Sequence, residues 1–224
     1  MNGNGSIRMI YQGTDANRTE ETTQIGTSAF NRNDDRSEYV GLKYTTGSQH
    51  GQTTDSTILN TLQSWYTSSN LDDYADYIDT SVGFCSDRNM ASGSSWSSTG
   101  STHYYAANGR LIDNKSPSLS CTTSDIIKEP IGLIAADEVS FAGGVFGINN
   151  TSYYLYNNQD YWTMSPSYFN DGLVGVFLVF SNGSITLDVW FVSDTFGVRP
   201  VINLKADTQF TGEGTVNSPF EVAS

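Results

Sequence analysis

The sequence of 224 residues predicts one α+β domain, in which two early helices precede a late antiparallel sheet with long loops. Three observations predict this class. A 3.6-residue apolar period runs from Ile58 to Tyr66, four strand-like segments follow residue 160, and Asn182-Gly183 between two of them is a hairpin signal. A chain of this length removes roughly 70% of its unfolded surface from water on folding, so residues 1–224 need no second domain.

Each predicted helix begins after a residue that can cap it. Asp55 is the expected N-cap of the first helix, and Asn70 is that of the second. Apolar residues then recur on one face, as Ile58, Leu59, Leu62, Trp65 and Tyr66 in the first helix and as Leu71, Tyr74, Ala75 and Ile78 in the second. The first of these two patterns is the strongest helical signal in the chain.

The late strands are expected at residues 161–164, 174–180, 184–189 and 198–204. Residues 6–11 also read as a strand. Its partner either preceded the present N-terminus, so that the chain is truncated there, or lies far along the sequence. Residues 131–135 are expected to form a buried strand that runs into a short turn or helix at residues 137–139.

Two long segments are polar and rich in turn residues, so we expect surface loops at residues 12–51 and 91–102. The first loop contains two short apolar islands, at residues 28–30 and 39–42. These islands should anchor it to the core.

The composition is that of a globular chain that carries its polarity on uncharged residues. Hydrophobic residues make up 37% of the chain and charged residues only 16%, whereas Ser, Thr, Asn, Gly and Tyr are abundant. Such neutral polarity suits an extracellular or cell-surface location. The net charge of -13 repels nucleic acid and anionic membranes, so we expect neither as a partner.

No segment is suited to crossing a membrane. The chain has no apolar run of 18 residues, and residues 1–5 lack the apolar core of a signal peptide. We therefore expect no membrane insertion by this chain, and any export signal must be encoded outside it.

The two cysteines, Cys85 and Cys121, form an even pair in a chain with few other redox or metal ligands. They fit one disulfide that closes a loop of about 36 residues, worth roughly 3–4 kcal/mol in the chain-entropy model. The alternative is a pair of buried free thiols. We predict the disulfide.

Residues for catalysis are sparse. The two histidines, His50 and His103, lie in Ser-, Thr- and Gly-rich segments, and a bonded cysteine pair leaves no evident nucleophile and base. The paired acids Asp34-Asp35 and Asp72-Asp73 lack the alternating oxygen spacing of a calcium loop, so they read as solvated charges. We therefore expect no enzyme, no cofactor and no metal site.

Residues 167–194 differ in character from the strand-like blocks on either side of them. They are rich in large apolar and aromatic residues and are interrupted by Gly and Asn turns. Side chains alternate along residues 174–180, and both of the resulting faces are apolar. Either this strand is buried on both sides, or one face is an exposed apolar patch of the kind that marks a binding site.

We expect the exposed patch, because large aromatic residues of the kind found here are enriched as interface anchors. The side chains expected to face solvent on one surface are Tyr168, Phe169, Leu178, Trp190 and Phe191. Those expected in the core are Phe177, Val179, Val198 and Ile202. The full candidate ligand-binding set is Tyr168, Phe169, Asn170, Leu173, Val174, Leu178, Phe180, Leu187, Trp190, Phe191 and Ser193.

Four segments carry a resemblance to a known family: GFCSDR at 83–88, PIGLIAADEV at 130–139, YWTMSP at 161–166 and GVRPVINLK at 197–205. They resemble extracellular and pilin-associated proteins of gut bacteria whose C-terminal domains are similar to the C-type lectin fold, as in the variable proteins of diversity-generating retroelements. The resemblance covers nearly the whole chain. It implies a C-type-lectin-like domain at the cell surface.

In such retroelement systems, mutation of adenines turns AAC and AAT codons into NNC and NNT codons, which cannot encode Met, Gln, Lys, Glu or Trp. These five types fill 25 of the 185 positions outside residues 165–203, which predicts about 5 among the 39 positions within, yet only Trp190 occurs there. Strand composition alone also depletes Lys and Glu. Trp190 is then either a fixed position or an argument against diversification.

Lectins of this fold bind sugars through calcium with Glu-Pro-Asn or Gln-Pro-Asp, whereas here Glu129-Pro130 is followed by Ile131. The resemblance therefore does not extend to calcium-dependent sugar binding. It implies a ligand-binding domain for adhesion or recognition, with a protein as the first ligand class and a glycan as the second. The alternative is a pilus or surface subunit that uses the same face for assembly. An enzyme of the formylglycine-generating type comes third and would need catalytic cysteines.

Overall fold

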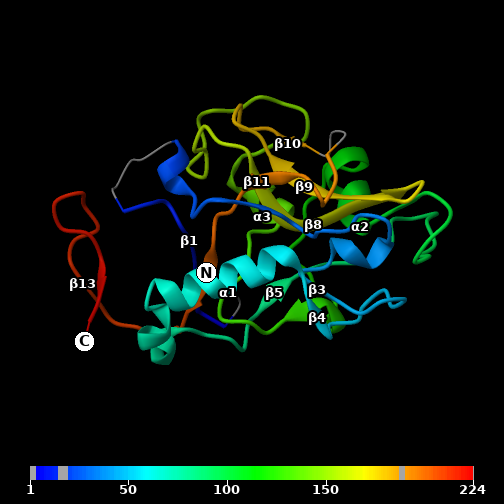
Figure 1. The fold of residues 1–224 in the computed structure, drawn as a ribbon. Helices are drawn as coiled ribbons and strands as arrows, with labels where there is room; N and C mark the ends of the chain where they lie inside the picture. The colour runs from blue at the N-terminus through cyan, green and yellow to red at the C-terminus, as the bar shows by residue number, and fades with distance from the viewer. Residues whose placement is uncertain (1–3, 15–19, 187–189, 224) are drawn as a thin grey trace.

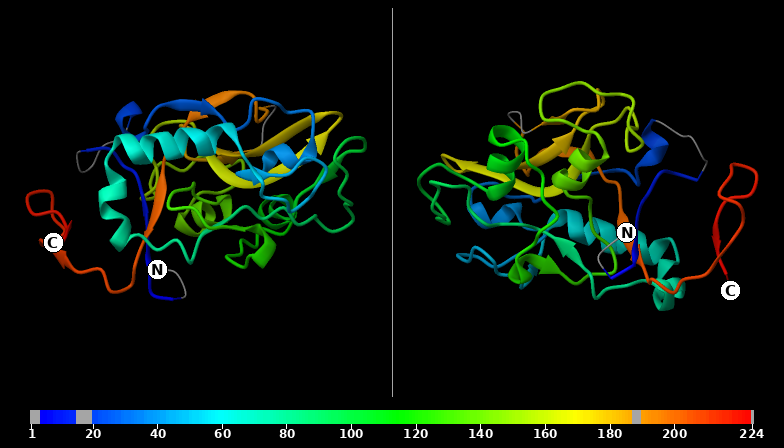
Figure 2. Two further views of the ribbon diagram at one scale, coloured as in Figure 1. Left: turned by 60° about the horizontal axis from the view of Figure 1, so that its bottom comes forward. Right: turned by 180° about the vertical axis from the view of Figure 1, so that it is seen from behind.

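The structure is a computed structural model that describes residues 4–14, 20–186 and 190–223. It has the predicted mixed α+β class. A central sheet is flanked by helices and long loops (Figure 1). The helices α1 (Thr57–Ser68) and α3 (Ala136–Ala142) lie on opposite sides of this sheet (Figure 2).

The central sheet has the strand order β10-β9-β8-β11-β2, and β6 pairs with β8 at its far end. The pairs are antiparallel except for β8 with β11. The strands are β2 (Thr27–Ala29), β6 (His103–Tyr104), β8 (Tyr161–Asn170), β9 (Leu173–Val179), β10 (Ile185–Thr186) and β11 (Thr195–Gly197). The predicted strands at 161–164 and 174–180 are confirmed as β8 and β9, and the predicted turn at Asn182-Gly183, where Gly183 has a φ of 80°, joins β9 to β10 in an antiparallel pair. Of the strand predicted at 184–189, residues 187–189 lie outside the described residues. The strand predicted at 198–204 covers only Val201–Leu204 and lies outside the central sheet.

Smaller two-stranded pairs surround the central sheet. They are β1 (Ile7–Ile10) with β12 (Val201–Leu204), β3 (Lys43–Tyr44) with β4 (Thr54–Asp55), β5 (Phe84–Cys85) with β7 (Ile126–Ile127), and β13 (Phe210–Thr211) with β14 (Glu221–Val222). The first pair identifies the partner of the N-terminal strand, because Ile7 lies opposite Leu204. Of the two alternatives for that partner, the distant one is confirmed.

The first predicted helix is present as α1, but its N-cap is Ser56. The Ser56 Oγ accepts a hydrogen bond from the Leu59 amide at 3.3 Å. Asp55 was the wrong prediction because it lies in β4, where its carboxylate pairs with Lys43 Nζ at 2.9 Å. The buried face of α1 consists of Ile58, Leu59, Leu62 and Tyr66, as predicted.

The second predicted helix is a 3-10 helix, η3 (Leu71–Tyr77), with no buried residue. Asn70 is at the N-cap position, as predicted, with a φ of 57°, but its side chain makes no capping hydrogen bond. The other short helices are η1 (Glu21–Thr23), η2 (Ser37–Val40), α2 (Ala106–Asn108), the π-helix η4 (Gly109–Asp113) and η5 (Thr123–Asp125). Residues 91–102 form the predicted loop.

Both faces of β8 and β9 are covered. On the α1 side, the Trp162 ring packs edge-on against Phe30 at 5.8 Å, and Leu178 lies opposite Trp162 in the strand register. On the α3 side, Ser165 Oγ accepts a hydrogen bond from the Ala136 amide, and the Phe177 ring meets Phe146. Phe30 belongs to the segment predicted as a surface loop, and its apolar island therefore forms a cover over the sheet.

Residues 131–134 are buried and Ala135 is half-buried, but the segment does not form the predicted strand. The segment pairs with β12 only at Gly132, which exchanges two backbone hydrogen bonds of 2.9 Å with Val201. Two residues later, the Ile134 carbonyl accepts a hydrogen bond from the Met164 amide of β8. The segment thus passes from one sheet to the other, which prevents a continuous ladder with either. The helix predicted after it is confirmed as α3.

The predicted disulfide joins Cys85 of β5 to Cys121, with a Cα–Cα distance of 5.9 Å. Two free thiols, the alternative, are thereby ruled out. None of the helices in the described part of the chain is long and apolar enough to cross a membrane.

Candidate functional site

The hairpin of β8 and β9 ends in a two-residue turn at the edge of the molecule (Figure 1). Asp171 and Gly172 have φ values of 50° and 82°, the pair of positive angles that a type I′ turn requires. Asn170 precedes the turn and is exposed, and its Oδ1 accepts a hydrogen bond of 2.6 Å from Thr102 Oγ1. The turn is therefore held against the loop of residues 91–102.

Two tyrosines lie side by side next to this turn. Tyr104 of β6 is paired with Tyr168 of β8, and Tyr104 is 45% exposed. The half-buried Tyr168 ring lies over Gly175, where a Cβ atom would approach Tyr168 Cε1 to 2.6 Å. Gly175 thus provides the space in which the Tyr168 ring rests.

Residues 190–194 run past the same end of β9. The Val192 amide donates to the Val174 carbonyl at 3.0 Å, and the Val192 carbonyl accepts from the Asn31 amide at 2.8 Å. Ser193 Oγ is hydrogen-bonded to Asp34. This arrangement leaves Trp190 40% exposed, with one edge against Phe196 at 5.4 Å.

We refer to these side chains together as the recognition surface: Thr102, Tyr104, Tyr168, Asn170, Leu173, Trp190, Phe191 and Ser193. Six of the eight belong to the predicted set. Thr102 and Tyr104 were not predicted, because they follow a Ser- and Gly-rich loop. The three consecutive ring residues His103, Tyr104 and Tyr105 were the signal that could have found them.

Three predicted ligand-binding side chains are buried in the core. Phe169 and Val174 are 0% exposed and Leu178 is 1% exposed, so the prediction that Phe169 and Leu178 face solvent is wrong. The reason is the cover supplied by Phe30 and η2 on the α1 side of the sheet. The strand is therefore buried on both sides, which was the alternative.

The remaining predicted residues have mixed outcomes. Phe180 is half-buried beside the Asn182-Gly183 turn, at the end of β9 away from Leu173, so it does not join the recognition surface. Leu187 lies outside the described residues. Phe177, Val179 and Val198 are core residues as predicted, whereas Ile202 is only half-buried against the core.

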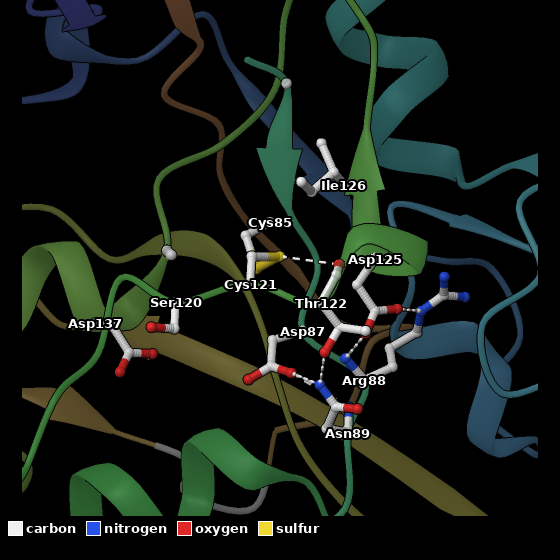
Figure 3. The surroundings of a disulfide bond; sticks show 12 residues. Cys85, Asp87, Arg88, Asn89, Ser120, Cys121, Thr122, Asp125, Ile126 and Asp137 are labelled. Carbon is white, nitrogen blue, oxygen red and sulfur yellow. Dashed lines mark hydrogen bonds and ion pairs between the residues drawn. A yellow bond between two sulfur atoms is a disulfide. The ribbon is translucent and has the colours of Figure 1, made fainter. Parts of the chain in front are cut away.

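Both histidines have structural surroundings. His103 is 1% exposed, its ring stacks on Phe169 at 5.2 Å, and burial lowers the pKa of its imidazole below 6.5. His50 Nδ1 lies 2.9 Å from the buried Asp125 carboxylate, which also accepts hydrogen bonds from the backbone amide and Nε of the buried Arg88 (Figure 3). These contacts tie loops together.

A cavity of about 370 Å³ lies beside the disulfide, and Asp87 and Asp137 are among the residues that line it. Both side chains are drawn in Figure 3, which shows the surroundings of the disulfide. Arg110 joins the two carboxylates, with Nη1 at 2.7 Å from Asp87 Oδ2 and Nη2 at 2.9 Å from Asp137 Oδ2. The Ser118 amide also donates to Asp137. Because the ionic groups satisfy one another, this network fixes the cavity wall. In the described part of the chain, no group of three or more His, Cys, Asp or Glu side chains could hold a metal ion.

Comparison with known proteins gave no match: no protein-family model, no curated protein and no solved structure matches this chain.

Proposed function

We propose that this chain is a recognition domain that binds a protein ligand through the recognition surface, at the surface of a cell. The observation that carries the proposal is the partial exposure of four aromatic side chains, Tyr104, Tyr168, Trp190 and Phe191, which come from three separate segments. Tyr and Trp are enriched as anchors in protein interfaces because they combine a large apolar body with a polar tip. Polar neighbours such as Asn170 and Ser193 supply the hydrogen-bonding rim of such a surface.

The test uses immobilised fibronectin, laminin, collagen and mucin as probes for the purified domain. We expect binding to one of them, and we expect Tyr104→Ala and Trp190→Ala each to weaken that binding by tenfold or more, as for an interface hot spot. Phe141→Ala is the matched control, since Phe141 is 60% exposed on α3. Binding to none of the four proteins, or equal binding by all variants, would contradict the proposal.

A second candidate function is assembly into a pilus or surface structure. It is favoured by a separate group of exposed apolar side chains on residues 141–154, namely Phe141, Val145, Ile148 and Tyr154. The Gly147 amide donates a hydrogen bond of 3.0 Å to the Ile185 carbonyl of β10, so this segment lies at the end of β9 away from the Asp171-Gly172 turn. Concentration-dependent self-association that Tyr154→Ser and Ile148→Ser abolish would favour assembly over ligand recognition.

The finer proposal is that a diversity-generating retroelement alters this surface within a C-type-lectin-like domain. Its support is the near absence of the five unreachable residue types from residues 165–203. Changes tolerated by the fold would then concentrate at positions outside the core, such as the exposed Asn170 and the half-buried Ser193, and they would spare Phe169 and Leu178. A near-repeat of this coding segment beside a reverse transcriptase gene is the expected observation. Variation that falls equally on the buried positions would contradict it.

A further inference from the structure

A polar groove of about 660 Å³ lies between α1, the loop of residues 31–34 and the β3–β4 pair. Its volume is within the range of about 300–1,000 Å³ that small-ligand sites occupy. Asn31 forms part of the lining and is only 5% exposed, with its amide nitrogen 3.5 Å from the Tyr39 carbonyl. The other side of this loop contacts Val192 and Ser193, so the loop separates the groove from the recognition surface.

One wall of the groove is the outer face of α1. Thr57, Asn60, Thr61 and Ser64 line it at the spacing i, i+3, i+4 and i+7, which places them along one face of the helix. The outer face of a surface helix usually carries charged residues. Here the 12 residues of α1 include no Asp, Glu, Lys or Arg, so this wall presents hydroxyl and amide groups alone.

Several polar groups at the groove have bonding capacity left over. Asn60 donates to the Ser56 carbonyl at 2.9 Å through Nδ2, which leaves its Oδ1 as an acceptor. On the facing loop, the side chains of Arg32 and Asn33 are exposed and make no hydrogen bond or ion pair with the residues that the structure describes. Donors thus face acceptors across the groove.

The end of the groove combines an aromatic ring with an ion-paired carboxylate. Tyr44 is half-buried and packs edge-on against Tyr39 at 5.1 Å. Burial raises the pKa of the Tyr44 phenol, so its hydroxyl is protonated at neutral pH and can donate a hydrogen bond. The Asp55 carboxylate is paired with Lys43 Nζ at 2.9 Å, and the same Lys43 Nζ lies 2.7 Å from Glu129, so two carboxylates share one ammonium group. Asp55 therefore acts as a hydrogen-bond acceptor whose charge Lys43 only partly offsets.

We propose that this groove binds a saccharide, without calcium, through Arg32, Asn60 and Tyr44. A saccharide offers hydroxyl groups that both donate and accept, together with apolar C–H faces that can lie against the Tyr44 ring. Nucleic acid is excluded by the net charge of -13. The proposal does not depend on the proposed function, because none of these residues belongs to the recognition surface.

The test is isothermal titration calorimetry of the full chain in a buffer that contains EDTA. The four saccharide probes are maltotriose, cellotriose, N,N′,N″-triacetylchitotriose and trigalacturonate. At least one of these should bind. The double variant Arg32→Ala/Asn60→Ala should weaken binding by tenfold or more, which corresponds to about 1.4 kcal/mol. Trigalacturonate as the tightest ligand would assign a carboxylate contact to Arg32, whereas a neutral trisaccharide would assign hydroxyl contacts.

The matched control is Thr67→Ala, an exposed position on α1 that does not line the groove. It should bind as the wild type does. A second variant, Asn60→Arg, should block the groove while Arg32 stays in place. Failure of all four saccharides, binding that requires calcium, or equal binding by wild type and groove variants would overturn the proposal. Loss of saccharide binding in Tyr104→Ala alone would move the site to the recognition surface and would likewise overturn it.

Discussion

β9 and residues 190–194 both contain large apolar side chains, yet those side chains differ in burial. Residues 174–179 of β9 are all buried, whereas Trp190 is 40% exposed and Phe191 is half-buried. The difference arises far away in the sequence, because Phe30 and η2 cover one face of β9 and α3 covers the other. Whether an apolar strand is a surface or a core element thus depends on which distant segment packs on it.

The largest effects on the free energy of unfolding are expected for substitutions on the two faces of β9. Phe177→Ala should lower the free energy of unfolding by about 3–5 kcal/mol and Leu178→Ala by about 2–5 kcal/mol, because both substitutions leave cavities in a packed interior. Urea denaturation measures both values. A change of less than about 0.5 kcal/mol for Leu178→Ala, as for an ordinary surface site, would show that the α1-side cover is absent.

A third region, around Cys85 and Cys121, is held in place by a disulfide bond rather than by the burial of a strand. The double variant Cys85→Ser/Cys121→Ser should lose about 3–4 kcal/mol of stability, because the disulfide limits the entropy of a loop of 36 residues in the unfolded chain. Chemical denaturation of the variant gives the value. Wild-type protein denatured with a thiol reductant is the control and should show the same loss.

His103 lies between Thr102 and Tyr104 of the recognition surface, and its ring stacks on buried Phe169 of β8. Its folded-state pKa is below 6.5, so the unfolded chain binds a proton more readily than the folded chain as pH falls through 6.5. Stability from this residue is therefore present at pH 7 and is lost on acidification. Urea midpoints measured from pH 7.5 to 5 should fall more steeply for wild type than for His103→Phe. Parallel curves would contradict this assignment.

The smallest effect on stability is expected for an exposed side chain of the recognition surface. Tyr104→Ala removes a ring that is 45% exposed and loses one cross-strand pair with Tyr168, so it should cost at most about 1 kcal/mol. Thermal unfolding provides the measurement. A loss as large as that of Phe177→Ala would mean that Tyr104 is a core residue and would weaken its assignment to the recognition surface.

The sequence predicts local features of this fold well. The 3.6-residue period located α1, the Asn-Gly pair located the β9–β10 turn, and the even cysteine count identified the disulfide. Errors of one residue, such as Asp55 for Ser56 as the cap, arise because both side chains can accept the same hydrogen bond. Only the path of the backbone, with Asp55 held in β4, decides between them.

Features that depend on contacts between distant segments were not predictable. Two apolar faces along residues 174–180 fit a buried strand and an exposed patch equally well, and the choice rests on Phe30, more than 140 residues earlier. The polar face of α1 was present in the same periodic pattern as its buried face. It becomes one wall of a groove only because the loop of residues 31–34 lies opposite it.

The pairing of β1 with β12 governs when this molecule can finish folding. Arg8 and Asn203, which are bonded through their side chains in this pair, are separated by 195 residues. Contacts this distant form slowly because the entropy of closing the intervening chain must first be offset. A chain that is still being synthesised therefore lacks the strand that pairs with Ile7–Ile10 until Val201–Leu204 have emerged. Up to that moment β1, with its unpaired backbone groups and apolar side chains, is open to association with other chains.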